Sequence, residues 1–305
     1  MSSSSIPQPG EPIIEVRGLK KIFGTQTVLD GLTMDIHRGE TLVVMGGSGC
    51  GKSTFLRMLI GSFPPSEGTI SMLGNRIDQL DEEGMNEIRS NFGILFQSGA
   101  LFQSMTLAEN VALPLEEHTD LDQMIIDIQV KIKLELVGLR EHADKLPSQI
   151  SGGMKKRAGL ARALALDPLI LFYDEPSAGL DPVTSAEIDQ LIVDLTKKLG
   201  VTSVVVTHEM DSAFTIADRM VMLDKGRVLR VDTRDAFDKI RKIPADEIET
   251  LTIEEQLIRQ FLRGDPVGPI TQRRAETNYA EDLLSTAGPS ITSSPAVEAT
   301  RRRAK

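Results

Sequence analysis

The sequence has no tryptophan, a single cysteine and few aromatic residues, which make up 4% of the chain. The lone cysteine, Cys50, excludes an intramolecular disulfide and any metal site built from several cysteines. No apolar run approaches the roughly 18 residues that a membrane-spanning helix needs, and residues 1–12 lack the basic and apolar regions of a signal peptide. We therefore expect a chain that neither crosses a membrane nor is exported.

The chain also lacks an excess of positive charge. Its 44 acidic residues outnumber its 34 basic ones and leave a net charge of −10. Because nucleic-acid binding depends on a basic face, this balance argues against nucleic acid as a partner. The length of 305 residues and the 40% hydrophobic content are ordinary for a globular protein with one large or two smaller domains.

What the chain does contain is an alternation of short β-rich runs with helix-like stretches and glycine-rich turns. Several runs are almost continuous in Val, Ile, Leu and Phe, as strands covered on both faces require. The alternation predicts an α/β fold with a largely parallel, buried sheet and helical crossovers. The expected strands are Ile13–Val16, Thr41–Met45, Phe92–Phe96, Leu169–Tyr173, Thr202–Val206 and Met220–Leu223.

The β signal disappears between Gln97 and Ser151, where Leu121–Val137 carries apolar residues at helical spacing, including Leu121, Ile125, Ile128, Ile132 and Val137. We expect a helical subdomain inserted into the α/β core. A β ribbon over Met220–Val231, turned at Lys225-Gly226, precedes another helical stretch, Thr252–Arg263. The predicted organisation is a disordered lead-in over 1–12, a core domain over 13–240 with the inserted subdomain at about 98–160, a helical extension over 241–270 and a disordered tail over 271–305.

The most specific motif is Gly46-Gly47-Ser48-Gly49-Cys50-Gly51-Lys52-Ser53, which matches the phosphate-loop pattern G-x-x-x-x-G-K-[ST] between an expected strand and an expected helix. The glycines allow backbone N–H groups to face phosphate oxygens, and the helix N-terminus and Lys52 add positive charge. The motif predicts nucleotide binding, with Mg²⁺ at Ser53. We also expect the Cys50 thiol to be acidified and reactive, since it lies near a helix N-terminus and Lys52.

A second candidate is the pair Asp174-Glu175 at the end of the apolar run from Leu169. Because an unpaired buried acid is costly, a strand that stops at two carboxylates suggests acids beside a metal at the sheet edge. Asp174 would hold Mg²⁺ and Glu175 would orient or deprotonate the water that attacks the γ-phosphate. Taken alone, this segment favours a solvated acidic turn before Pro176, and the metal-site interpretation depends on the phosphate loop.

A third candidate is Ser151-Gly152-Gly153, which precedes a helix former and places Ser151 as its N-cap. Its glycines allow an anion to approach a second helix N-terminus. Taken alone, it is an ordinary helix start.

In this order and spacing, the phosphate loop, Gln97, Ser151-Gly-Gly, Asp174-Glu175, Gly179-Leu-Asp181 and His208 resemble the motifs of ABC-transporter ATPases over about residues 13–240. The resemblance implies a P-loop NTPase fold of RecA type with an N-terminal antiparallel β region, and a head-to-tail homodimer that holds ATP between the phosphate loop of one copy and the Ser-Gly-Gly helix of the other. It further implies that Gln97 senses Mg²⁺ and water, that Asp181 couples the two sites, that His208 contacts the γ-phosphate and that Phe23 stacks on adenine. Motif and resemblance together assign three roles. Catalysis is assigned to Glu175, His208, Gln97 and Lys52, and Mg²⁺ binding to Ser53, Gln97 and Asp174. ATP binding is assigned to Phe23, Gly46, Gly47, Ser48, Gly49, Cys50, Gly51, Lys52, Ser53, Thr54, Ser151, Gly152, Gly153 and Asp181.

Three stretches resemble the ATPase subunits of MCE-type lipid transporters, which include the bacterial Mla system. This resemblance implies phospholipid transport between the inner and outer membranes, with permease subunits and an MCE-domain lipid-binding protein, and peripheral association with the cytoplasmic face of the inner membrane through these partners. The first stretch is Leu95–Phe102 followed by Pro114–Thr119, and the second is Ile150–Met154, with Met154 where most relatives have Gln. The third is Arg259–Gly264 with Gly268-Pro269. It lies in an extension that we expect to touch the neighbouring ATPase copy.

Two other functions remain open. One is the ATPase of an importer for amino acids or another small solute. The other is a soluble ABC ATPase that acts on nucleic acid or ribosomes, although Ser53 and Ser151 lie too close for a long inserted coiled coil and no second cassette follows.

Overall fold

The computed structural model describes residue 8 and residues 10–271. The expected tail, apart from Thr271, and most of the expected lead-in therefore lie outside the described residues. The chain divides into two compact units, one ending at Ile243 and the other beginning at Pro244.

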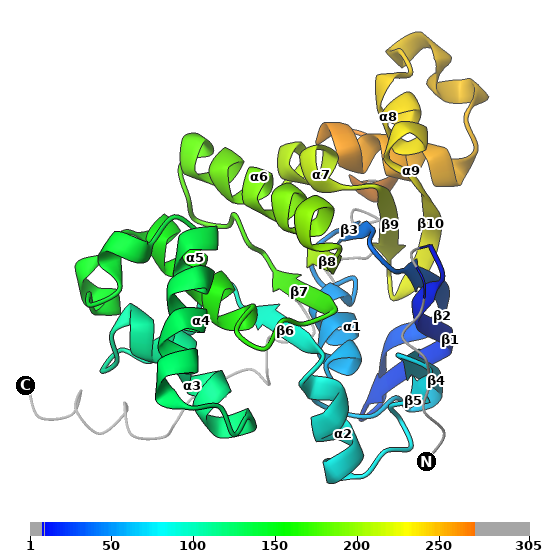
Figure 1. The fold of residues 1–305 in the computed structure, drawn as a ribbon. Helices are drawn as coiled ribbons and strands as arrows, with labels where there is room; N and C mark the ends of the chain where they lie inside the picture. Colours follow the sequence, from blue (N-terminus) through cyan, green and yellow to red (C-terminus); the bar gives the residue numbers. More distant parts are fainter. Residues whose placement is uncertain (1–7, 9, 272–305) are drawn as a thin grey trace, which may run out of the picture. The chain divides into compact units, whose positions relative to one another are not determined.

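A six-stranded sheet forms the centre of the first unit (Figure 1). Five of its strands are parallel, and β10 pairs antiparallel with β9 through the turn at Lys225-Gly226, where both residues have positive φ as a tight hairpin requires. Every residue of β3 and β8 is buried, which confirms the expectation of a sheet covered on both faces. In spatial order the strands are β10 (Arg227–Thr233), β9 (Arg219–Asp224), β3 (Thr41–Gly46), β8 (Thr202–Val206), β7 (Ile170–Asp174) and β6 (Phe92–Leu95).

A second, antiparallel sheet confirms the expected N-terminal β region. Its long strands alternate between buried and exposed positions, because one face packs on the core and the other meets solvent. Register shifts interrupt the pairing of β1 with β2, so the apolar spacing of this region departs from a strict period of two. The strands are β1 (Pro12–Phe23), β2 (Gln26–His37), β4 (Glu67–Met72) and β5 (Asn75–Arg76).

Helices cover both faces of the central sheet. Figure 1 shows α1 on one side of the strands and α6 and α7 on the other. Between β6 and β7, helices α3, α4 and α5 pack on one another and form the expected inserted helical subdomain. The described helices of this unit are α1 (Lys52–Leu59), α2 (Glu82–Arg89), α3 (Leu107–His118), α4 (Gln123–Leu136), α5 (Gly152–Ala163), α6 (Pro182–Leu199), α7 (Met210–Ile216) and α8 (Arg234–Lys242), with 3₁₀ turns η1 (Arg140–His142) and η2 (Pro147–Gln149).

Helix α4 is the helix expected within Leu121–Val137, but its packed face is not the one that the apolar spacing suggested. The helix buries Ile126, Val130 and Leu134. Four of the five apolar residues that revealed the helix remain between 39% and 50% exposed, namely Leu121, Ile125, Ile128 and Ile132. The helix is therefore apolar on two faces, of which this chain covers one.

The second unit contains the 3₁₀ turn η3 (Ala245–Thr250) and helix α9 (Ile253–Arg263). Thr252 and Glu255 form a capping box at the start of α9. The buried side chain of Gln260 accepts a hydrogen bond from the Ile270 N–H at 2.7 Å and donates one to the carbonyl of Asp265 at 3.1 Å, which ties the chain after α9 back onto the helix. Within the described residues, no helix is both long enough and apolar enough to cross a membrane.

Candidate functional site

The phosphate loop joins the end of β3 to the start of α1, as its motif predicts. Gly46 and Gly51 have φ values of 149° and 104°, a region that favours glycine. A Cβ atom on Gly46 would lie 2.3 Å from the carbonyl oxygen of Leu223, and one on Gly51 would lie 2.4 Å from a methyl carbon of Leu29. These two positions therefore require glycine for space as well as for conformation.

The N-terminus of α1 is open to an anion. Its N-cap is Gly51, so no side chain accepts hydrogen bonds from the first N–H groups of the helix. Ser48 and Ser53 are exposed and Thr54 is half-buried. The Lys52 ammonium donates hydrogen bonds to the carbonyls of Gly46 at 2.7 Å and Gly47 at 3.2 Å, and so lies across the loop. This arrangement presents N–H groups, hydroxyls and a positive charge to a phosphate.

The expectation of an acidified Cys50 is wrong. The Cys50 side chain is buried, and burial raises the pKa of its thiol despite the nearby positive charge of Lys52. Burial disfavours the thiolate more than Lys52 stabilises it. Cys50 therefore has a packing role beneath the loop, where its Sγ would lie 2.7 Å from a Cβ on Gly46.

Asp174 ends β7 at the carboxyl edge of the sheet. Its pKa is raised mainly by burial and also by the negative charge of Glu175, whereas the positive charges of Arg57, Lys156 and Lys52 act in the opposite direction. Val44 of β3 and Asp174 of β7 both pair with Val206 of β8, so the phosphate loop and this carboxylate lie at the same edge of the sheet. A bound divalent cation would relieve the cost of the buried negative charge.

The donor set fits Mg²⁺ shared with a phosphate ligand. The described residues contain no group of three or more His, Cys, Asp or Glu side chains that could hold a metal by themselves. Mg²⁺ binds proteins through one or two oxygen ligands and completes its shell with phosphates and water. Ser53 and Asp174 supply such oxygens, and the exposed Gln97, which follows β6, carries a third.

Glu175 and His208 meet at the sheet edge, although they come from the loops after β7 and β8. Nδ1 of His208 lies 2.9 Å from Oε1 of Glu175, and the His208 N–H donates to Oε2 at 3.3 Å. The Glu175 side chain is 14% exposed and that of His208 is 62% exposed. The pair therefore offers a sheltered carboxylate beside an imidazole that is open to a ligand.

Glu175 has an unusual backbone. Its φ of 50° lies in the left-handed region, which costs free energy for a residue with a Cβ. Its N–H donates to the carbonyl of Val206 at 2.9 Å, and its own carbonyl accepts a hydrogen bond from the ammonium of Lys156 at 2.9 Å. Strain of this kind is found at positions where function requires one geometry.

Ser151 is the N-cap of α5, as predicted, and accepts a hydrogen bond from the N–H of Met154 at 3.3 Å. Ser151 and Gly152 are exposed. A Cβ on Gly153 would lie 2.3 Å from Cγ2 of Thr184, and the hydroxyl of Thr184 donates to Asp181 at 2.6 Å. Asp181 also caps α6, and the hydrogen bonds from Thr184 hold its pKa below the usual value.

Two of the predicted site segments lie together without reaching the phosphate loop. Gly153 and Asp181 are joined through Thr184, whereas within residues 10–271 no hydrogen bond or ion pair links Ser151 to the phosphate loop of the same chain. The Ser-Gly-Gly segment is therefore a second helix N-terminus, which Ser151 caps and which is exposed to solvent at Ser151 and Gly152.

The loop after Gln97 rests directly on α5. A Cβ on Gly159 would lie 2.8 Å from the carbonyl oxygen of Gly99, so the two backbones are in contact with no side chain between them. Arg162 donates a hydrogen bond to the carbonyl of Ala100 at 2.9 Å. The position of this loop is therefore fixed by α5.

Phe23, at the end of β1, is 48% exposed. Its ring packs edge-on against Phe63, with centroids 5.5 Å apart, and the Lys21 ammonium lies 5.1 Å from the ring centre. Half of the ring area remains open for stacking on a planar ligand.

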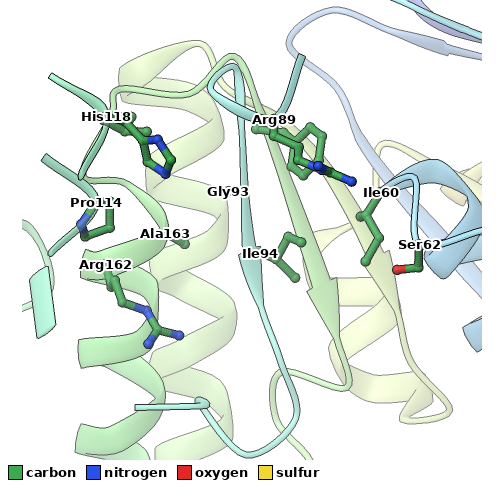
Figure 2. Close-up of a pocket in the computed structure, with 11 residues that line it drawn as sticks. Ile60, Ser62, Arg89, Gly93, Ile94, Pro114, His118, Arg162 and Ala163 are labelled. Carbon is green, nitrogen blue, oxygen red and sulfur yellow. The ribbon is translucent and has the colours of Figure 1, made fainter. Parts of the chain in front are cut away.

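A pocket of about 410 Å³ lies between the inserted helices and the edge strand β6. Figure 2 shows Pro114, His118 and Arg162 on one side of Gly93 and Ile94, with Arg89, Ile60 and Ser62 on the other. The wall is apolar along β6 and carries two arginines, Arg162 and Arg89, of which Arg89 pairs with Glu82 at 3.0 Å.

His118, from the stretch Pro114–Thr119 that carries the resemblance to MCE-type transporters, lines the pocket. The sequence interpretation missed two residues that the structure places at or beside the functional surfaces. Arg162 and Lys156 belong to the predicted helix after Ser151, without a role of their own. The signal that a sequence offers for Lys156 is a lysine on the apolar, packed side of a helix, since lysine is rarely buried unless it is paired.

Comparison with known proteins identifies several relatives. A family model described as ABC transporter matches residues 29–178. The chain is 44% identical over 271 residues to the probable ribonucleotide transport ATP-binding protein mkl of Mycobacterium leprae, an alignment that covers 88% of this chain and 74% of the relative. It is 36% identical over 272 residues to the intermembrane phospholipid transport system ATP-binding protein MlaF of Escherichia coli K12, covering 89% of this chain and 96% of the relative.

Two solved structures are similar to the fold. CbiO1 from Clostridium perfringens, part of the ABC transporter complex CbiONQ, has a TM-score of 0.71 at 32% identity and covers 76% of this chain and 94% of that one. The ATP-binding cassette MJ0796, in a dimeric post-hydrolysis state with ADP and phosphate, has a TM-score of 0.67 at 30% identity and covers 72% of this chain and 98% of that one.

Proposed function

The chain belongs to the ABC-transporter ATPases, and we propose that within this family it is the subunit whose ATP hydrolysis drives phospholipid transport between membranes. The observation that carries the proposal is the similarity to MlaF along 96% of that protein's length, at 36% identity. A second candidate, transport of ribonucleotides or another small solute, is favoured by the name of the 44% identical relative mkl.

We propose that two copies bind ATP head to tail. The N-terminus of α1 and Lys52 would hold the triphosphate from one side, and Ser151 with Gly152 would approach it from the other copy. The proposal is supported by the exposed helix N-terminus at Ser151 and Gly152 and by the dimer of the relative MJ0796. Two helix N-termini and a lysine neutralise a triphosphate better than either half does alone.

In the proposed hydrolysis step, Glu175 orients and deprotonates the attacking water. Its carboxylate is sheltered and lies next to His208, whose exposed ring would donate to a γ-phosphate oxygen. Lys52 would stabilise the negative charge on the phosphate oxygens in the transition state. Mg²⁺, held near Ser53, Gln97 and Asp174, would supply charge neutralisation of the phosphates when bound.

We propose that the permease docks in the pocket beside β6 and that it acts on the ATP site through Arg162. The same residue lines the pocket and holds the carbonyl of Ala100 in the loop after Gln97. A segment that enters the pocket would therefore shift this loop, and with it the Gln97 side chain. The stretch Pro114–Thr119, which carries the resemblance to MCE-type transporters, supplies Pro114 and His118 to the wall.

The partners in this proposal are a second copy of the chain, membrane permease subunits and an MCE-domain lipid-binding protein. The chain would associate peripherally with the cytoplasmic face of the inner membrane through the permease, since no described helix is able to span a membrane. The second unit, with α9, would touch the neighbouring ATPase copy.

Reconstitution tests the transport proposal. The chain would be co-expressed and co-purified with candidate permease and MCE-domain proteins of its own organism and placed in proteoliposomes. We expect ATP-dependent transfer of a fluorescent phospholipid, abolished by Lys52→Ala, and no ATP-dependent uptake of radiolabelled ribonucleotide. Ribonucleotide uptake without lipid transfer would establish the second candidate instead.

A further inference from the structure

Lys156 is a buried lysine at the join between the inserted helices and the catalytic edge of the sheet. It lies on α5, the helix that Ser151 caps, and only 5% of the residue is exposed. Its ammonium donates a hydrogen bond to the backbone carbonyl of Glu175 at 2.9 Å. The nucleotide-facing helix and the proposed catalytic residue are thus linked by one side chain.

Lys156 contacts the backbone of Glu175, the residue with the strained φ. The left-handed φ of 50° at Glu175 is unfavourable for a non-glycine residue and persists only where the surroundings hold it. The Glu175 carbonyl accepts hydrogen bonds from Lys156 at 2.9 Å and from the Ala178 N–H at 3.3 Å. The charged donor makes the shorter contact, and charge-assisted hydrogen bonds are the stronger class.

The charges around Lys156 support an ammonium that is bound to this site. Burial lowers the pKa of Lys156, while the negative charges of Glu209, Glu175 and Asp174 raise it. Burial is the largest effect, so the pKa of Lys156 is lowered overall, and the nearby acidic residues partly offset this loss. The ammonium is one of the positive charges near these carboxylates, together with Arg57 and Lys52 at Asp174.

We propose that Lys156 is a positioning residue for ATP hydrolysis, holding the strained Glu175 peptide so that its carboxylate meets the attacking water, and that it makes this geometry depend on the position of α5. The inference rests on the proposed catalytic role of Glu175. Because Ser151 begins the same helix, a movement of α5 toward the nucleotide of the partner copy would move the Lys156 donor relative to Glu175.

The test compares two buried lysines in the full-length chain. Lys156→Met removes the ammonium and keeps the length of the side chain. Lys133→Met is the matched control, since Lys133 is 3% exposed and pairs with Asp167, away from the sheet edge. We expect Lys156→Met to lower kcat at least about tenfold with the ATP dissociation constant changed less than about twofold, and Lys133→Met to keep kcat within about twofold of wild type.

Rescue by a conservative change separates positioning from folding. Lys156→Arg keeps a charged donor and should restore part of the kcat that Lys156→Met loses. Lys156→Gln keeps only a neutral donor, so its kcat should lie between those of Lys156→Met and Lys156→Arg. If Lys156→Met does not fold, the order of kcat among wild type, Lys156→Arg and Lys156→Gln decides the question, and equal values would overturn the inference.

The outcomes also separate this inference from the proposed role of Glu175. Wild-type kcat in Lys156→Met, or an equal loss of kcat and of ATP binding, would overturn the positioning role while Glu175→Gln remained inactive. If Glu175→Gln itself kept wild-type turnover, the catalytic assignment would fail first and the inference with it.

Discussion

Oε1 of Glu175 lies 2.9 Å from Nδ1 of His208, although the two residues lie on different loops of the sheet edge. One side chain is sheltered and the other is open to a ligand. The Glu175 carboxylate contacts the His208 imidazole, and the Glu175 backbone has a strained, left-handed φ. In the proposed mechanism Glu175 acts on water and His208 meets the phosphate, and the first prediction tests the role of Glu175.

Glu175→Gln should bind ATP but lose turnover. The amide keeps the size of the side chain and its contact with His208, yet it has no basic oxygen to accept a proton. General-base catalysis contributes about 10²- to 10⁴-fold, so we expect phosphate release to fall by at least about a hundredfold. Equilibrium binding of a fluorescent ATP analogue should be unchanged and dimers should accumulate. Phosphate release at the wild-type rate would remove Glu175 from the mechanism.

Lys52→Ala should weaken ATP binding. In the structure the ammonium is held over the loop by the carbonyls of Gly46 and Gly47, close to where phosphate oxygens would lie. Loss of a charged hydrogen-bond donor should raise the ATP dissociation constant about 10- to 100-fold. Lys131→Ala, on the solvent-exposed side of α4, is the control and should bind ATP as wild type does. Isothermal titration would report both constants, and equal values would contradict the assignment.

Gly153→Ala should destabilise the protein through one identifiable clash. The added Cβ would lie 2.3 Å from Cγ2 of Thr184, whose rotation is restricted by its hydrogen bond to Asp181. We expect a loss of about 1–3 kcal/mol in the free energy of unfolding. Thr184→Ser removes Cγ2, keeps the hydroxyl and should compensate in the double variant. Additive losses in urea unfolding would show that the cause lies elsewhere.

The stability of Asp189→Asn relative to wild type should increase with pH. Asp189 is buried on α6, its Oδ2 accepts a hydrogen bond from Ser212 at 2.7 Å, and burial raises its pKa. The folded carboxyl keeps its proton where the unfolded chain releases it, so its contribution to stability falls as pH rises above about 4. Asparagine does not titrate. Melting temperatures of both proteins from pH 4 to 7 should therefore diverge in favour of the variant, and parallel curves would contradict the prediction.

Deletion of residues 257–305 should weaken the ATPase dimer. The deleted part includes Gln260, which ties residues 265–271 onto α9, so its removal dismantles the second unit. We expect a lower dimer fraction by analytical ultracentrifugation with ATP and the Glu175→Gln substitution present. Deletion of 272–305 alone is the control. An unchanged dimer fraction in the longer deletion would refute the proposed contact with the neighbouring copy.

Much of the fold was predictable because buried parallel strands leave a strong signal. The runs Leu42–Met45 and Val204–Val206 are apolar throughout, and both lie in strands of the central sheet. The antiparallel sheet was harder to place, because β1 and β2 alternate and shift register. Apolar spacing also found α4 without finding its packed face, since spacing reports amphipathicity and not which neighbour covers it.

The phosphate loop between β3 and α1 was predictable because glycine, lysine and serine at fixed spacing have few other reasons to occur together. The behaviour of individual side chains was not. The pKa of Cys50 depends on burial beneath the loop, and the role of Lys156 depends on a contact between segments that are distant in sequence. Such quantities are set by tertiary packing, which a local pattern does not contain.

The contact of Gly159 with the carbonyl of Gly99 joins two backbones without an intervening side chain. Side chains are compressible, because they change rotamer and absorb small displacements, whereas peptide groups in van der Waals contact do not. A push of a few tenths of an ångström on either segment must therefore appear on the other at nearly full size. Alanine at position 159 would act as a wedge and force the loop after Gln97 away from α5.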